Sequence, residues 1–496
     1  MNDLAEKALE GLDVAYRAAR SRALVTVGVI GFGLGVVIVF AAGRVGASST
    51  IRPLTTWFGI QDSRTVQAAD PTPASILLIA VVALVVLWLV TVEVVRRRTP
   101  HEPAVWGVFA AWAAPFAVGP PLFDPSVYSY AAFGLIQRAG HDPYTTPPSG
   151  LGFARVVEAV DPGSRGVQSS AGPLGTLVQH LAASVGVGSA LGIVIVLRVV
   201  AVVAVVWIGR TAADMGGRRP ARALSLTVLN PLLLFYVISA ARLEGLMTAL
   251  ALAAVAAANR RSWGRALVLA AAAASVLGQA LVVVAAIIVV HVRARGQRTA
   301  ARVLLHDVPI VAVAIAVFGL IVPNGFGWIG NVDEQFSTHT PFSVSDGTST
   351  LLRPVMRGAA TYDTLTASSR VATLIAMGVA VVALLVTTQL RPLERTAGYL
   401  FLAVGLLAPT LYPWYVIAGV VCIAPSSNAV RKIWVLGISA AACLLMPGGF
   451  MRTTSEVLTA IGLASVALVT GLAVRRKFRL GQTGEEPELP TVVSSR

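Results

Sequence analysis

Residues 122–130 read LFDPSVYSY, and residues 137–144 continue the polar run with QRAGHDPY. The run belongs to a chain of 496 residues, of which 56% are hydrophobic and 13% are charged. Backbone that lacks regular hydrogen bonding is not tolerated against lipid, so a run with these carboxylates and prolines must lie outside the hydrocarbon. The run is therefore expected at the membrane surface, where chemistry can occur.

The remaining sequence predicts an all-α, polytopic membrane protein with about 12–14 transmembrane helices. We expect residues 23–475 to form a single membrane domain. Apolar runs of membrane length lie at 23–43, 74–95, 104–121, 188–209, 221–239, 243–259, 307–323, 370–389, 397–410, 413–425, 432–447 and 455–474.

Residues 265–292 are too long for one span at 1.5 Å per residue, and arginines both precede and follow them. A hairpin of two short helices that turns near Ser275–Gln279 keeps both arginine groups on the same side of the membrane.

The net charge of +15 resides in short Arg and Lys clusters between apolar spans. This distribution is typical of cytoplasmic loops and excludes nucleic acid as a partner, since no single face is basic. It places residues 44–73, 122–187 and 324–369 on the outer side of the cell membrane and both termini in the cytoplasm. Within 122–187, the pieces Val127–Gln137 and Gly175–Val185 predict short interfacial helices.

The two ends of the chain differ from its middle. Residues 1–22 predict a charged, amphipathic cytoplasmic lead-in, and residues 476–496 predict a disordered cytoplasmic tail. The two cysteines, Cys422 and Cys443, both lie in apolar segments, and the six histidines show no paired spacing. The sequence therefore encodes neither a disulfide framework nor a metal site.

Asp124 is the candidate general base. It directly follows a span that ends in Gly119-Pro120-Pro121, so its carboxylate is expected at the outer mouth of the membrane. A base at headgroup depth can deprotonate an acceptor hydroxyl that attacks a lipid-linked donor. The structural alternative is an Asp-Pro turn that merely ends a helix.

Three further charged residues are candidates for holding a donor's phosphate or lipid. Arg198 lies near the middle of an apolar span, where it must find a partner; that partner is either a ligand's phosphate or a buried carboxylate. Arg242 and Glu244 open a span at the outer face. Arg242 either grips a phosphate with its planar fork or solvates a helix end.

Aromatic residues gather at the same boundary. Trp414 and Tyr415 either anchor the chain at the membrane interface or stack on a sugar. Tyr128, Tyr130, His141, Asp142 and Tyr144, all from the opening run, are further candidates for substrate binding.

Several motifs occur together in a fixed order. Val127-Tyr128-Ser129-Tyr130 is followed by Gly140-His141-Asp142-Pro143-Tyr144, Gly172-Pro173-Leu174, Asn230-Pro231-Leu232, Glu244-Gly245-Leu246-Met247 and Pro413-Trp414-Tyr415. This set resembles the polyprenyl-phosphomannose-dependent α-1,6-mannosyltransferases of the multi-spanning GT-C class of glycosyltransferases.

The resemblance implies an inverting enzyme that transfers mannose from polyprenyl-phosphate-mannose to a lipid-anchored mannan of the lipomannan or lipoarabinomannan type. Membrane lipids are implied partners, no cofactor is implied, and a requirement for a divalent cation is left open. The chain departs from the family at three places. Ser126 stands where an acidic residue is usual, with Asp124 two residues earlier. Arg242-Leu243 stands where His-Asn is expected, and Gly278-Gln279 stands in the hairpin where a lysine is expected.

These departures keep two other interpretations open. One is a catalytically inactive relative that retains the fold as a scaffold, favoured by Ser126. The other is a transporter of lipid or sugar, favoured by the intramembrane Arg198, although the sequence shows no internal repeat and no matched pair of broken helices.

Overall fold

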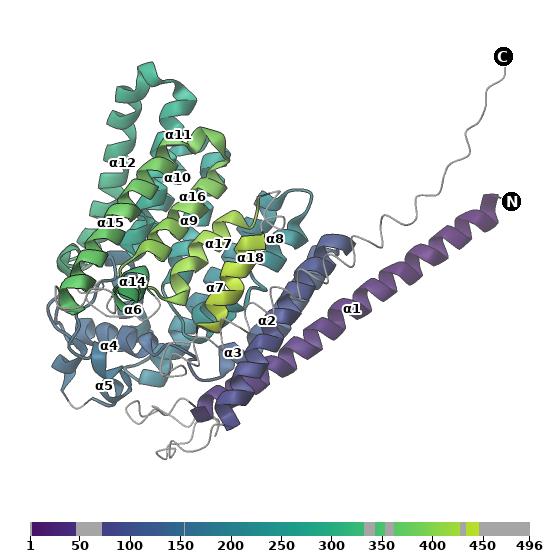
Figure 1. The fold of residues 1–496 in the computed structure, drawn as a ribbon, viewed down its shortest axis with the longest axis horizontal. Coiled ribbons are helices and arrows are strands. Elements are labelled where there is room, and N and C mark those ends of the chain that lie inside the picture. Colours follow the sequence, from purple (N-terminus) through teal and green to yellow (C-terminus); the bar gives the residue numbers. More distant parts are fainter. Residues whose placement is uncertain are drawn as a thin grey trace.

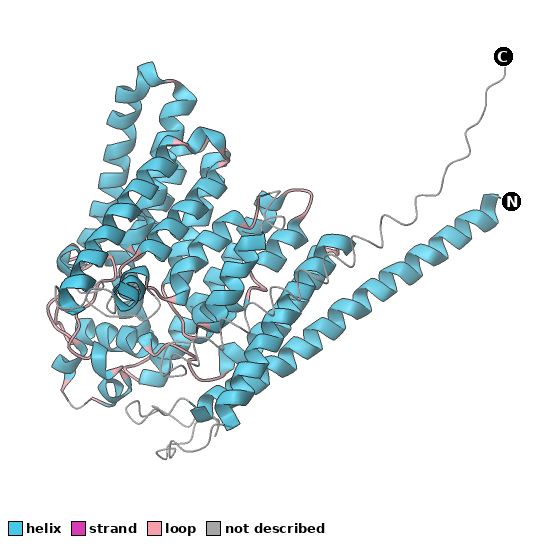
Figure 2. Cartoon of the chain, in the orientation of Figure 1, coloured by secondary structure: helices cyan, strands magenta, loops and turns pink. Residues whose placement is uncertain are grey.

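The computed structural model describes residues 2–45, 72–152, 154–331, 343–352, 362–426 and 433–445. These residues form helices and loops without a β-strand (Figure 2). The protein is therefore all-α, as predicted. The predicted span 455–474, the tail 476–496 and nearly all of the outer segment 44–73 lie outside the described residues.

Figure 1 shows how the described helices are arranged. The α-helices are α1 (Asn2–Val45), α2 (Thr72–Arg98), α3 (Glu102–Val118), α4 (Ser126–Arg138), α5 (Arg155–Ala159), α6 (Pro173–Val185), α7 (Ala190–Gly216), α8 (Pro220–Leu226), α9 (Glu244–Asn259), α10 (Trp263–Val276), α11 (Leu281–Arg295), α12 (Ala300–Ile321), α14 (Val344–Leu352), α15 (Tyr362–Val386), α16 (Leu393–Leu407), α17 (Ile417–Ile423) and α18 (Ile433–Leu444). The π-helix η3 (Leu233–Ser239) and the 3-10 turns η4 (Gly278–Ala280), η6 (Gly327–Asn331) and η8 (Pro413–Val416) matter for the site.

Among the described residues, six helices are long and apolar enough to cross a membrane, or up to seven if one bent pair counts as a span. Shorter apolar helices such as α10 and α18 lie beside them. The protein is a multi-pass membrane protein. Helices α12 and α15 expose large apolar side chains, among them Leu320 at 81% and Val379 at 64%, which suits contact with lipid tails.

Residues 265–292 form the predicted hairpin, since α10 and α11 meet at a break around Leu277. Gly172 packs against this break, and its N–H donates to the carbonyl of Val276 at 3.0 Å. A Cβ on Gly172 would lie 2.4 Å from the carbonyl oxygen of Ser275. The Gly-Pro-Leu motif therefore starts α6 where only a residue without a side chain fits.

The predicted continuous span 221–239 is interrupted. Helix α8 ends at Leu226, and η3 begins only after Asn230-Pro231. Pro231 lacks an N–H for a helical bond, and the Asn230 side chain accepts a hydrogen bond from the N–H of Leu232 at 3.1 Å. The local sequence thus ends one helix and starts another within the expected span.

A second bend follows at once, because η3 and α9 meet at 111°. Gly245 permits this turn: a Cβ there would lie 2.2 Å from Cγ1 of Val237. The turn brings the start of α9 to the same level as the start of α4.

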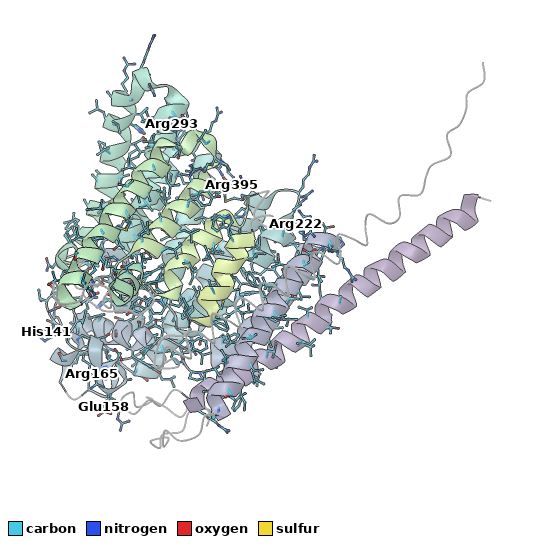
Figure 3. The ribbon with its side chains drawn as sticks, in the orientation of Figure 1. His141, Glu158, Arg165, Arg222, Arg293 and Arg395 are labelled. Atoms are coloured by element: carbon cyan, nitrogen blue, oxygen red, sulfur yellow. The ribbon has the colours of Figure 1, made fainter. Side chains whose placement is uncertain are left out.

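The arginines at helix ends and the 122–187 segment lie at opposite ends of the molecule. Figure 3 shows Arg222, Arg293 and Arg395 toward one end and His141, Glu158 and Arg165 toward the other. Short helices occupy the second end, with α4 and α6 where sequence patterning predicted them. Helix α1 runs unbroken from Asn2 to Val45, so residue 22 marks no break in the helix.

Candidate active site

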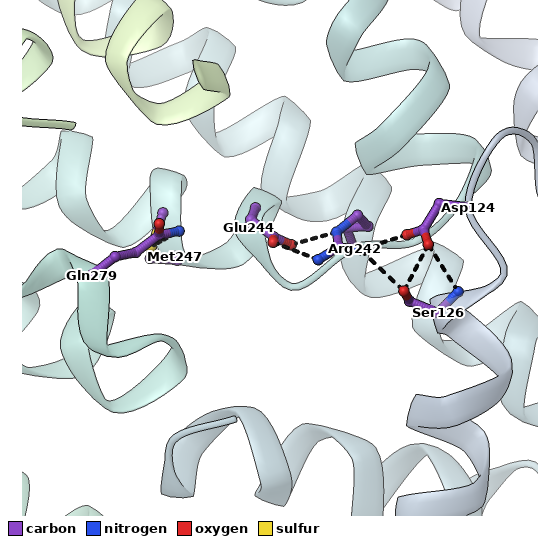
Figure 4. Close-up of polar contacts among 6 residues, drawn as sticks. All are labelled: Asp124, Ser126, Arg242, Glu244, Met247 and Gln279. Carbon is purple, nitrogen blue, oxygen red and sulfur yellow. Dashed lines mark hydrogen bonds and ion pairs between the residues drawn. The ribbon is translucent and has the colours of Figure 1, made fainter. Parts of the chain in front are cut away.

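Asp124, Arg242 and Glu244 form a buried cluster where α4 and α9 begin (Figure 4). Nη1 of Arg242 lies 2.6 Å from Oδ2 of Asp124. Its Nη2 and Nε donate to the two carboxylate oxygens of Glu244 at 2.7 and 2.9 Å. The side chains of Arg242, Asp124 and Glu244 are only 10%, 5% and 4% exposed, so a single guanidinium is shared by two buried carboxyl groups.

Ser126 joins this cluster through its hydroxyl. Its Oγ donates to Oδ1 of Asp124 at 2.7 Å and accepts from Nη1 of Arg242 at 3.1 Å. The N–H of Ser126 also donates to Oδ1 at 3.2 Å, an Asx turn at the start of α4. The turn folds the carboxylate of residue 124 back to the side chain of residue 126, so the two-residue offset in sequence closes in space.

The backbone is strained immediately before both charged residues. Phe123, which precedes Asp124, has φ +60°, and Ala241, which precedes Arg242, has φ +50°. Residues other than glycine adopt such angles at a cost of about 1–3 kcal/mol, and such outliers cluster at functional sites. Each strained residue immediately precedes one member of the 2.6 Å ion pair.

Aromatic rings enclose Arg242. Its guanidinium carbon lies 3.8 Å from the ring centroid of Trp414, and Tyr412 stacks on the same indole at 4.5 Å with an interplanar angle of 7°. Tyr415 packs edge-on against Tyr412 at 5.8 Å. Burial raises the pKa of Tyr130 above its usual range, so its hydroxyl stays protonated near the cluster.

Four N–H groups of Arg242 are engaged by Asp124, Ser126 and Glu244. A guanidinium carries five, so these three residues use all but one of them. Beyond Glu244, Nε2 of Gln279 donates to Sδ of Met247 at 3.3 Å, which connects the α10–α11 break to the first turns of α9.

Arg198 lies outside this cluster. It is 4% exposed and donates hydrogen bonds to the backbone carbonyls of Ala117, Gly119 and Ser239. Because the guanidinium of Arg198 bonds to backbone carbonyls, the structure does not favour the expected contact between Arg198 and a phosphate.

The motif at residues 140–144 belongs to a different network. Asp142 accepts from the N–H of Tyr144 at 2.8 Å and from Asn324 at 2.6 Å, and the Tyr144 hydroxyl lies 2.8 Å from Oγ1 of Thr176. Burial raises the pKa of Tyr144 to about 12. His141 is exposed, and the Asp142–Asn324 hydrogen bond connects segment 122–187 to the segment that begins at residue 324.

Sequence reasoning selected Asp124, Arg242 and Glu244 as candidates without predicting their contact. In the structure Arg242 contacts both carboxylates. Tyr128 is buried at 4%, on the other hand, which does not favour direct contact with a substrate. The hydrogen bonds of Ser126 and Ser239 were missed. Ser126 was noted only for the acid that it replaces, and a single serine in an apolar run, such as Ser239, carries no distinctive sequence signal.

The fold and this site define a multi-pass membrane protein with a buried acid–base cluster at one end of its helices. Residues 25–293, more than half of the chain, match the family described as "Alpha-(1->6)-mannopyranosyltransferase, N-terminal domain". The chain belongs to this family.

Two relatives extend the comparison. The chain is 29% identical over 342 residues to alpha-(1->6)-mannopyranosyltransferase A of Mycobacterium tuberculosis, an alignment that covers 65% of this chain and 65% of that protein. It is 25% identical over 471 residues to alpha-(1->6)-mannopyranosyltransferase B of Corynebacterium glutamicum, covering 83% of this chain and 76% of the relative. The chain thus spans somewhat less than two thirds of the first relative's length.

Proposed function

We propose that the protein is an inverting mannosyltransferase that transfers mannose from polyprenyl-phosphate-mannose to a lipid-anchored α-1,6-mannan at the outer face of the cell membrane. The observation that carries this proposal is the buried Asp124–Arg242–Glu244 cluster where α4 and α9 begin. Helix α4 lies toward the end of the molecule opposite Arg222, Arg293 and Arg395 (Figures 1 and 3). Family membership supports the sugar and the linkage.

Asp124 is the better base of the two carboxylates. Glu244 has both oxygens held by Arg242, whereas Oδ1 of Asp124 is held by the Ser126 hydroxyl and backbone N–H. An acceptor hydroxyl can replace the serine hydroxyl at Oδ1 more readily than a substrate can displace a bidentate guanidinium.

The proposed step is a single displacement. The acceptor oxygen forms a bond to C1 of mannose while the bond from C1 to the phosphate oxygen breaks, and its electron pair leaves with the polyprenyl phosphate. The hydroxyl proton passes to Oδ1 of Asp124. Attack on the face opposite the leaving group turns a β-linked donor into an α-linked product. Arg242 can offer its one remaining N–H to the departing phosphate.

Orientation and domain limits are part of the same proposal. We infer that the arginine-rich helix ends face the cytoplasm, because short cytoplasmic loops carry the excess of positive charge. Residues 23–475 would then be the catalytic membrane domain, with 1–22 and 476–496 as its cytoplasmic ends.

The test uses membranes from cells that make the wild-type chain, Asp124→Asn or Glu158→Gln, supplied with labelled polyprenyl-phosphate-mannose and a lipid-anchored mannan. Glu158 is an exposed carboxylate in the same outer segment and serves as the matched control. We expect Asp124→Asn to lower transfer by about 10²–10⁴-fold, the usual contribution of a general base, and Glu158→Gln to leave it unchanged.

Two other results would point elsewhere. Donor binding without transfer by the wild-type chain would indicate an inactive scaffold, the alternative suggested by Ser126. Movement of intact donor across vesicle membranes without mannose transfer would indicate a transporter.

A further inference from the structure

Arg198 occupies an unusual place for a charged side chain. It lies within the first third of α7, a helix long and apolar enough to span a membrane, and it is 4% exposed. Burying an arginine in a membrane helix costs at least about 2.5–3.5 kcal/mol on insertion scales. Such a cost indicates that the side chain does something an apolar residue cannot.

Its hydrogen bonds connect two chain segments that are far apart in sequence. Nη1 donates to the carbonyl of Ala117 at 3.1 Å and also to that of Gly119. Nε and Nη2 both donate to the carbonyl of Ser239, at 3.1 and 2.8 Å. The first two carbonyls close α3, and the third closes η3.

These two segments lead directly to two residues of the cluster. The backbone runs from Gly119 through the strained Phe123 to Asp124, and from Ser239 through the strained Ala241 to Arg242. Arg198 therefore holds the last regular turn before each of the two residues that form the 2.6 Å ion pair.

Ser239 adds a second link between the same segments. Its Oγ donates to the carbonyl of Pro120 at 3.1 Å and accepts from the N–H of Leu122 at 3.1 Å. Arg198 and Ser239 together fix the approach to Asp124 relative to the approach to Arg242.

We propose that Arg198 is a positioning residue for the Asp124–Arg242 pair. This inference rests on the proposed function, because it assigns Arg198 to the alignment of the base. A cation at the carbonyl ends of two helices is also favoured by their dipoles, which makes this residue type suited to the place.

The kinetic test compares Arg198→Lys and Arg198→Leu with Arg222→Leu. Arg222 is the matched control, since it too donates to a backbone carbonyl, that of Arg96, but at the other end of the molecule. On monodisperse protein, we expect Arg198→Leu to lower kcat by about 10²-fold with the KM for polyprenyl-phosphate-mannose unchanged, because a misplacement of about 1 Å costs that much. Arg198→Lys should recover part of the loss, since an ammonium offers three donors.

A cross-linking test needs no activity. Cysteines at Asp124→Cys and Arg242→Cys should be joined by a short bifunctional thiol reagent, and we expect less cross-linking when Arg198→Leu is added. The control pair, Asp142→Cys with Asn324→Cys, replaces two side chains 2.6 Å apart that Arg198 does not contact, and its cross-linking should not change.

The outcomes separate the two proposals. Absence of mannose transfer by the wild type, with Arg198-dependent cross-linking, would overturn the enzyme but not the positioning role. Unchanged kcat and unchanged cross-linking in Arg198→Leu would overturn the positioning role. A raised KM with normal kcat would make Arg198 a donor ligand instead. If Arg198→Leu does not fold, the same kinetic and cross-linking measurements are made on Arg198→Lys and Ser239→Ala.

Discussion

The guanidinium of Arg242 lies over the indole of Trp414, 3.8 Å from its ring centroid. Tyr412 stacks on the same indole, and Trp414 is only 5% exposed. Little of the indole ring is therefore open for a sugar to stack on. The indole instead supports the cation that holds Asp124.

Replacement of Trp414 should act through Arg242. A cation–π contact of this kind stabilises the pair by about 0.5–2 kcal/mol. We expect Trp414→Leu to lower kcat several-fold and to leave the KM for the acceptor unchanged, whereas Trp414→Phe keeps an aromatic face and most of the activity. Steady-state kinetics with varied acceptor would check this, and a large rise in the acceptor KM would restore the sugar-stacking role.

Exchange of residues 124 and 126 tests whether activity depends on a carboxylate in the cluster or on a carboxylate at residue 124 itself. Asp124→Ser combined with Ser126→Asp puts a carboxylate where Oγ of Ser126 now lies, 3.1 Å from Nη1 of Arg242. We expect the double variant to transfer mannose at least about tenfold faster than Asp124→Ser alone, because a base contributes far more than that. Equal, negligible rates in both variants would show that only the Asx-turn carboxylate can act.

Gly172 should tolerate no side chain. Because a Cβ there would lie 2.4 Å from a backbone oxygen, Gly172→Ala must push α6 away from the α10–α11 break. Overpacking of this kind destabilises by about 1–3 kcal/mol. A thermal unfolding measurement in detergent should show a lower midpoint, and Gly166→Ala, with nothing within 4 Å of the added atom, should match the wild type.

The orientation can be tested with thiol labelling. Both native cysteines are buried, so new ones report on their own location. We expect Ser149→Cys and Gly330→Cys, both exposed, to react with an impermeant reagent in intact cells, and Arg218→Cys to react only after lysis. Ser345 lies in the same outer segment but is fully buried, so it is unsuitable. The reverse labelling pattern would show that the protein has the opposite orientation in the membrane. It would contradict the proposal that the donor binds at the outer face.

Local signals in the sequence predicted much of the fold. Arginines on both sides of residues 265–292 were enough to predict the hairpin, and amphipathic spacing was enough to predict α4 and α6. The bend between η3 and α9 was not predictable in this way. It depends on the contact of Gly245 with Val237, which arises only once two helices meet.

The same distinction between local signals and non-local contacts applies to the site. The charge of Asp124, Arg242 and Glu244 marked them in an apolar sequence, but their mutual contact depends on non-local packing. The carbonyl partners of Arg198 could not be predicted, because every residue offers a carbonyl and only the folded chain shows which ones face the guanidinium.

The Asx turn at residues 124–126 bears on how members of the family are recognised. A search rule that requires an acid immediately before Val-Tyr-Ser-Tyr would discard this chain as degenerate. A rule that asks for a carboxylate within hydrogen-bond reach of the first residue of α4 would keep it, since Oδ1 of Asp124 lies 2.7 Å from Oγ of Ser126. In divergent sequences, a functional group is identified more reliably by its location in the fold than by its column in an alignment.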